Sequence, residues 1–202
     1  WHLEYRMSTL ELKELSHPSG EVIKIAAGKT LDLKTQGSVT MPTGSVLQVQ
    51  SKNYQGAYST NTASWLDVTN FNVTITPTST SSKILVNSLV QLGSSDWAGI
   101  NVVRKVTGQA DVIINQGNDT VGSKQNSTFG SINIAQWSTE MTAPMAMVYL
   151  DSPATTSAVT YQVQVVARYG STAQTVCINR PHAWNNDSIS GRVTSSNIVV
   201  QE

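Results

Sequence analysis

Residues 148–165, which read VYLDSPATTSAVTYQVQV, decide the fold. An apolar run ends at Asp151-Ser152-Pro153, a turn rich in threonine, serine and alanine follows, and a second strand begins near residue 160. That strand has the period of two expected of a sheet with one buried and one solvated face. The predicted buried side chains are Tyr161, Val163, Val165, Ala167 and Tyr169, and the predicted solvated ones are Gln162, Gln164 and Arg168.

The composition of the 202 residues is that of a nearly charge-free polar protein. Only 13% of the residues are charged, about half the usual share, and the formal net charge is zero. We count 25 Ser, 23 Thr, 14 Asn and 13 Gln, so uncharged polar groups outnumber charged ones almost threefold. This balance argues against electrostatic binding of nucleic acid, so we expect no nucleic-acid partner.

The single cysteine, Cys177, excludes an intrachain disulfide framework and a cysteine-based zinc site. Its neighbours are strand formers, which predicts a buried structural thiol and not a nucleophile. No apolar run approaches the ~18 residues of a membrane span, and no signal-peptide pattern is present. We therefore expect no membrane insertion.

Charge is concentrated near the N-terminus, where residues 1–52 hold 11 of the 26 charged side chains. Short apolar pairs alternate there with glycine turns, a pattern that predicts thin strands needing cover from the same chain or from sister copies. We expect an attachment, shaft and trimerisation segment over 1–50 and a tip domain over 51–202. Trp1–Arg6 precede the start-like Met7 and are either a cloning remnant or an upstream extension.

The rest of the chain predicts an all-β fold, since no segment of 11 or more residues has a helical period. Many short strands separated by turn signals are typical of a β-sandwich of jelly-roll type. The expected strands are 46–51, 64–69, 71–77, 82–92, 99–106, 111–116, 130–138, 144–150, 160–169, 174–179 and 196–201.

Three blocks of the sequence resemble a known protein class. They are 71–86 (FNVTITPTSTSSKILV), 149–161, and the closing residues 176–180, 191–192 and 195–202. They resemble segments of tail-fibre and other appendage proteins of bacteriophages, especially phages of marine and cyanobacterial hosts. The resemblance implies a virion appendage, a short shaft leading to a β-sandwich tip, usually a homotrimer attached to a tail or capsid. It implies no catalytic residue. The bulky loop 180–192 departs from the small polar loop of that pattern.

The candidate chemistry is sparse. The carboxylates outside the N-terminal region mostly occupy turn positions, Asp119 and Asp151 among them. His2, His17 and His182 lack metal-ligand spacing. We therefore expect no catalytic residue, no metal and no cofactor, although two carboxylates distant in sequence could still meet in a polysaccharide-cleaving groove.

Exposed tryptophans beside short polar residues are the better candidates, because indole rings stack on sugars while Asn and Asp bond to hydroxyls. The alternative role of each tryptophan is to plug the sandwich or an intersubunit seam, and Trp65 and Trp137 are expected in the core. The candidate receptor or interface residues are Asp96, Trp97, His182, Trp184, Asn185, Asn186 and Asp187.

The sequence thus predicts a non-enzymatic virion protein, a tail-fibre or receptor-binding tip that mediates host attachment. Its expected partners are its own copies in a homotrimer, other virion proteins through residues 1–50, and a host cell-surface glycan. Two alternatives stay open. One is a capsid-surface fibre or decoration protein without a receptor role, and the other is a polysaccharide depolymerase or lectin-like module.

Overall fold

The computed structural model describes residues 27–28, 41–42, 44–118, 122, 126–136, 140–183 and 192–202. The chain divides into two units, Trp1–Thr43 and Gly44–Glu202. Residues 44–50, expected from the sequence in the N-terminal segment, lie in the second unit. Most of the predicted shaft, including Trp1–Arg6, falls outside the described residues.

The second unit is all-β, as the sequence predicts, and within the described residues its one helical segment is the 3-10 turn η1 (Ile134–Gln136). The described strands are β1 (Val49–Tyr54), β2 (Tyr58–Thr62), β3 (Leu66–Ile75), β4 (Ile84–Ser94), β5 (Trp97–Val106), β6 (Val112–Ile113), β7 (Phe129–Asn133), β8 (Ala143–Asp151), β9 (Val159–Tyr169), β10 (Thr172–Ile178) and β11 (Ser196–Gln201). No helix within the described residues has the length and apolar character needed to cross a membrane.

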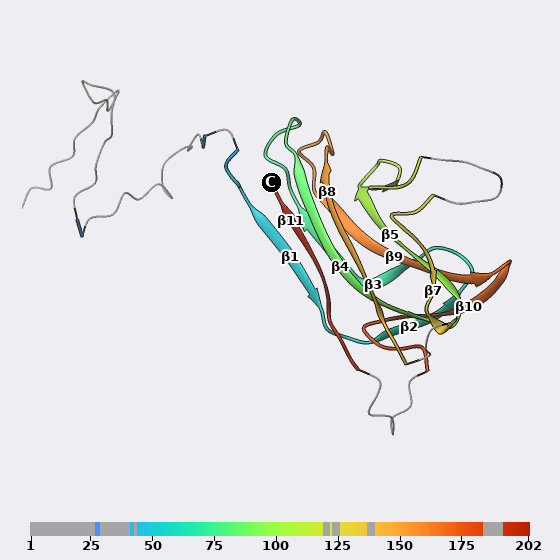
Figure 1. Cartoon of the computed structure of the whole chain (residues 1–202). Helices are drawn as coiled ribbons and strands as arrows, with labels where there is room; N and C mark the ends of the chain where they lie inside the picture. The colour runs from blue at the N-terminus through green and yellow to red at the C-terminus, as the bar shows by residue number, and fades with distance from the viewer. Residues whose placement is uncertain are drawn as a thin grey trace, which may run out of the picture. The chain divides into compact units, whose positions relative to one another are not determined.

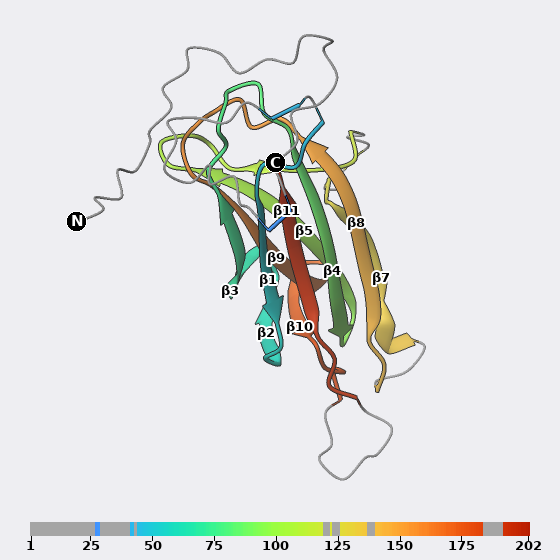
Figure 2. The same cartoon turned by 90° about the vertical axis from the view of Figure 1, so that its left-hand side faces the viewer.

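The strands pair antiparallel and form two layers (Figures 1 and 2). In the first layer β1, β11, β4 and β8 lie side by side, and β10 with β2 continues beside the far half of β4. In the second layer β3, β9 and β5 are adjacent, with β6 and β7 beyond β5. The β9–β10 hairpin joins the layers through the Tyr169–Thr172 pair.

Alternating apolar side chains from both layers fill the core. On β4, Ile84, Val86, Val90 and Leu92 are fully buried, and on β9 the inward residues Tyr161, Val163, Val165 and Ala167 are also fully buried. Burial of each large aliphatic side chain contributes about 1.5–3 kcal/mol, so this shared row is the main stabilising contact between the layers. At one edge, the rings of Tyr54 on β1 and Phe71 on β3 stack with centroids 4.7 Å apart.

Two side chains of β9 differ from the period-two prediction. Tyr169 is 66% exposed, because β9 reaches its hairpin there and leaves the core. Gln162, expected on the solvated face, is buried because β3 bulges between Asp67 and Asn72 and covers it. Its amide nitrogen donates to the carbonyls of Val68 at 2.9 Å and Phe71 at 3.3 Å. The bulge thus supplies the acceptors that a buried amide requires.

Several strand boundaries also differ from the sequence predictions. The strand β2 (YSTNT) was not predicted, since it lacks the aliphatic alternation that marks a strand. The segments 64–69 and 71–77 form the single strand β3, which bends at its bulge, where Asn70 has a positive φ of 61°. The strand predicted at 111–116 shortens to β6, and the one at 130–138 ends at Asn133, before η1.

Candidate receptor or docking surface

Two of the candidate residues, Asp96 in the β4–β5 turn and Trp97 at the start of β5, are held in place by hydrogen bonds. Asp96 Oδ1 accepts hydrogen bonds from the Trp97 backbone nitrogen at 2.8 Å and from Asn133 Nδ2 at 2.9 Å. The preceding Ser95 donates its backbone N–H to the Thr175 carbonyl at 3.0 Å. The Trp97 side chain is 45% exposed. An apolar ring is therefore presented to solvent on a turn whose backbone is fixed by neighbouring strands.

Trp65 lies on the same outer face of the second layer as Trp97. A Cβ atom on Gly99 would lie 3.1 Å from Trp65 Cη2 and 3.6 Å from Val166 Cγ1, so the indole lies directly over Gly99. Gly99 and Trp97 share one face of β5, since Ala98 between them points into the core. The expectation that Trp65 belongs to a core strand is wrong: it is half-buried, immediately before β3.

The base of the loop that begins at Arg180 is held by Asn179. This residue immediately follows β10, has a positive φ of 64° and is fully buried. Its Nδ2 donates to the carbonyls of Tyr54 at 2.6 Å and Gly56 at 3.1 Å, and its Oδ1 accepts from Ser196 Oγ at 2.6 Å. Because these contacts join β1, β10 and β11, the start of the loop is fixed to three strands.

A close backbone approach fixes the next part of the same loop. A Cβ on Gly93 of β4 would lie 2.3 Å from the Arg180 carbonyl oxygen and 3.2 Å from the Pro181 Cα. Only glycine allows backbone to pass this near to a strand. Arg180 and Pro181 therefore cover the outer surface of β4 at its far end.

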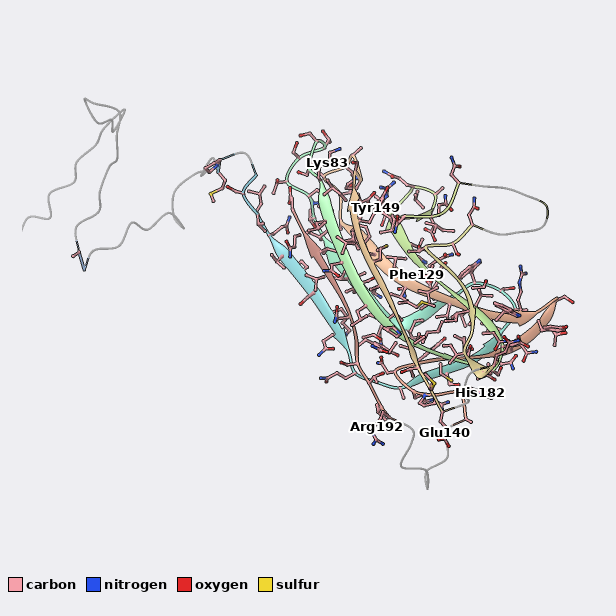
Figure 3. The ribbon with its side chains drawn as sticks, in the orientation of Figure 1. Lys83, Phe129, Glu140, Tyr149, His182 and Arg192 are labelled. Atoms are coloured by element: carbon pink, nitrogen blue, oxygen red, sulfur yellow. The ribbon has the colours of Figure 1, made fainter. Side chains whose placement is uncertain are left out.

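The third described candidate, His182, lies at the end of the sandwich where the chain continues beyond β10. Figure 3 shows His182, Glu140 and Arg192 at one end of the sandwich and Lys83 at the opposite end. His182 is half-buried, and its Nδ1 has no hydrogen-bond partner among the described residues. The candidates Trp184, Asn185, Asn186 and Asp187 lie outside the described residues, as does Trp137. Of the seven candidates, the structure thus places Asp96, Trp97 and His182.

The carboxylates on the outer face of the second layer are paired with a lysine. Lys105 Nζ lies 2.7 Å from Asp67 Oδ2 and 3.4 Å from Asp111 Oδ2. Partial burial would raise the pKa of Asp67, but hydrogen bonds from Lys105 and Gln164 outweigh it and lower that pKa. The bond to Asp67 also raises the pKa of Lys105. Asp67 and Lys105 are thus held in their charged forms, whereas a general acid requires a raised carboxyl pKa.

Asp151 forms a buried polar contact between the layers, which the sequence did not reveal. Its carboxylate lies 2.7 Å from Arg104 Nη1 and accepts a 2.8 Å hydrogen bond from the Tyr161 hydroxyl. The expectation of an ordinary turn position for Asp151 is wrong, because the residue ends β8 and is buried. The alternation of side chains along β8 could have predicted this burial, since Met147, Tyr149 and Asp151 share the inward face of the strand.

Glu202 is a second carboxylate whose hydrogen bonds give it a structural role. Its side chain accepts hydrogen bonds from the Thr78 backbone and hydroxyl, from Ser82 Oγ and from Gln48 Nε2. Burial acts to raise its pKa, but these bonds outweigh burial and lower the pKa to about 2. The serine and threonine cluster between β3 and β4 is therefore a cradle for this carboxylate. Among the described residues, no group of three His, Cys, Asp or Glu side chains is arranged to bind a metal ion.

Comparison with solved structures gives a weak similarity to a viral capsid protein. No protein-family model and no curated protein matches the chain. The crystal structure of the infectious bursal disease virus VP2 subviral particle aligns over 86% of this chain and 41% of that chain. The TM-score is 0.34 and the sequence identity is 8%. A similarity at this level carries no inference about shared function.

Proposed function

We propose that this chain is a non-enzymatic structural protein of a virion, a tail-fibre or appendage tip that attaches the particle to its host. Support comes first from the three sequence blocks that resemble phage appendage proteins. Two of these blocks have clear structural roles. The 71–86 block supplies the second half of β3, the Ser/Thr cradle of Glu202 and the start of β4, and the 149–161 block supplies Asp151 and Tyr161.

The observation that carries the receptor role is the placement of Trp97. Its ring is 45% exposed on a turn that Asp96 and Asn133 brace through hydrogen bonds. A fixed aromatic ring loses little conformational entropy on binding, and its face suits the apolar face of a sugar. We therefore propose a host-surface glycan as the ligand class. In a homotrimer, three such sites would bind together and multiply a modest single-site affinity.

Labelling of particles tests the virion role. Antibodies raised against the purified chain should mark the intact particles of the virus that encodes it, in electron micrographs. Labels on tail fibres support the attachment role. Labels on the capsid surface support the alternative of a decoration protein. Unlabelled particles, with the protein found only in the lysate of infected cells, contradict a virion role altogether.

A competition assay tests the receptor role separately. Host cells preincubated with purified protein should adsorb fewer particles, and Trp97→Ala should remove this inhibition. The matched control is Tyr169→Ala, an exposed aromatic residue at the β9–β10 hairpin, which should inhibit as the wild type does. Equal inhibition by wild type and Trp97→Ala contradicts the assignment of Trp97. Release of oligosaccharides from host envelope glycans by the wild type would instead support the depolymerase alternative.

A further inference from the structure

The strands β1, β11, β4 and β8 of the first layer present no charged side chain on their outer face, whose far end at Gly93 is covered by Arg180 and Pro181. Alternation places Leu85, Asn87, Leu89 and Gln91 of β4 on the outside, since their neighbours are buried in the core. The register sets Leu150, Leu85, Gln201 and Val49 in one row across the four strands, and Val148, Asn87, Val199 and Ser51 in the next. We call the outward side chains of β1, β11, β4 and β8 the uncharged face. None of them is Asp, Glu, Lys or Arg.

The apolar members of the uncharged face are unusually accessible. Val148 is 67% exposed, Leu150 57% and Val49 52%. Figure 2 shows the four strands of this face side by side, in front of the second layer. The outer face of the second layer differs, because it carries the ion pairs of Lys105 with Asp67 and Asp111. The two outer faces of the second unit therefore differ: one carries ion pairs, and the other is apolar and uncharged like the core of a protein–protein interface.

Strand β8 adds to this face a sheet edge whose central residues are unprotected. Among the described strands it pairs with β4 alone. Native sheets normally protect such an edge with lysine, with a bulge or with inward charge. Within β8, a proline (Pro144) and an inward charge (Asp151) protect the two ends, but residues Met145–Leu150 between them carry no charge and pair with β4 without a register shift. An edge with exposed apolar side chains and free backbone groups is a template for another strand.

We infer that the uncharged face is an interface between copies of this chain. A face without charge meets its own copy without like-charge repulsion, whereas a partner with charged groups would lose their hydration against it and gain no counter-charge. In a dimer two such faces stack, and in a trimer three of them line the axis. The inference deepens the proposed function by naming the surface through which the copies of a multivalent tip meet.

The size of the face fits the centre of such an interface. Four strands at about 4.8 Å spacing and about 3.4 Å per residue give a sheet of roughly 400–500 Å² in projection. Each partner in a standard interface buries about 800 Å², so the face would form the dry core and the surrounding loops its polar rim. Charge introduced at the centre of that core should therefore separate the copies.

Light scattering after gel filtration of the full chain tests the inference. The wild type should have two or three times the single-chain mass, and Val148→Lys and Leu150→Lys should each have the single-chain mass. The matched control is Val112→Lys, at a partly exposed valine of β6 in the second layer, which should keep the wild-type mass. All variants should keep the circular dichroism spectrum of the wild type, because the substituted side chains are exposed within one copy of the chain, and the β8 variants should lose only the concentration-dependent part of the melting temperature.

Two results would overturn the inference. One is a single-chain mass for the wild type up to its highest soluble concentration. The other is a multimeric mass that both β8 variants retain. Amide hydrogen exchange across Met145–Leu150 gives a second readout, since association should slow exchange at high protein concentration and dilution should restore it. These measurements concern mass and exchange in solution, so their failure is distinct from a failure to find the protein on particles.

Discussion

The Tyr161 hydroxyl donates a 2.8 Å hydrogen bond to Asp151 Oδ2 across the two layers of the sandwich. Tyr161 is fully buried on β9, and Asp151 is buried at the end of β8. Arg104 on β5 neutralises the carboxylate from the other side. These partners offset the cost of burying a carboxylate. Because they come from both layers, the three residues favour one position of the first layer over the second.

Tyr161→Phe should lower the free energy of unfolding by roughly 1–3 kcal/mol, because it leaves a buried carboxylate oxygen without its donor. The matched control is Tyr149→Phe on β8, a half-buried tyrosine whose hydroxyl has no hydrogen bond to a described residue, and its effect should stay within about 0.5 kcal/mol. Urea denaturation measures both. Equal losses for the two variants would show that the hydroxyl bond to Asp151 does not matter.

The same tyrosine predicts a loss of stability in alkali. Burial, with the neighbouring Asp151 carboxylate, raises the pKa of Tyr161 far above its ordinary value. A raised folded-state pKa stabilises the protein below the unfolded-state value of about 10, and this contribution is lost as the pH rises beyond it. The urea midpoint of the wild type should therefore fall above about pH 10. Tyr161→Phe should show a smaller fall over the same range.

Glu202→Gln should destabilise the protein at neutral pH and have little effect in strong acid. The hydrogen bonds from Thr78, Ser82 and Gln48 lower the folded-state pKa to about 2 from 4.5. A lowered pKa contributes stability that is present above about pH 4.5 and is lost as the pH falls towards 2. Denaturation midpoints of the wild type and the variant should converge over that window. Thr80→Ala is the control, since its side chain makes no hydrogen bond to a described residue. A constant difference at all pH values would contradict this role.

Gly93→Ala should destabilise the protein by about 1–3 kcal/mol, because the added Cβ would lie 2.3 Å from the Arg180 carbonyl oxygen and backbone would have to move. Gly130→Ala on β7 is the matched control, because no atom lies within 4 Å of its added Cβ. Thermal melting compares them. If Gly93→Ala melts with the wild type, Arg180 and Pro181 do not pack on β4 as described.

Cys177 should not react with a thiol reagent until the protein unfolds. The residue is fully buried on β10, and its Sγ lies 3.5 Å from Ser59 Oγ. One thiol per chain should react in denaturant and none in native buffer. Thr107→Cys in the exposed turn after β5 is the positive control and should react at once in native buffer. Rapid labelling of Cys177 in native buffer would mean that β2 opens away from β10.

The all-β class, ten of the eleven described strands and the inward row of β9 follow from the period of two, because alternation is a local property of the sequence. The burial of Gln162 does not, since it depends on a bulge in β3, a strand distant in sequence. The roles of Asp151 and Glu202 likewise depend on partners that only the fold brings near. The prediction of a core position for Trp65 is wrong because a tryptophan can bury its ring either in a core or over a glycine on the outer face of a sheet, and the sequence does not distinguish the two.

The pairing of β1 with β11 has a consequence for how the molecule forms. Val49 pairs with Gln201, so strands from the two extremes of the second unit must find one another before the first layer is complete. Loop closure over such a separation slows the search, which predicts folding in the range of milliseconds to seconds. During that interval the central strand β4 lacks one neighbour and can pair with a nascent sister chain. High-yield production should therefore benefit from cool, slow synthesis, which keeps incomplete molecules dilute.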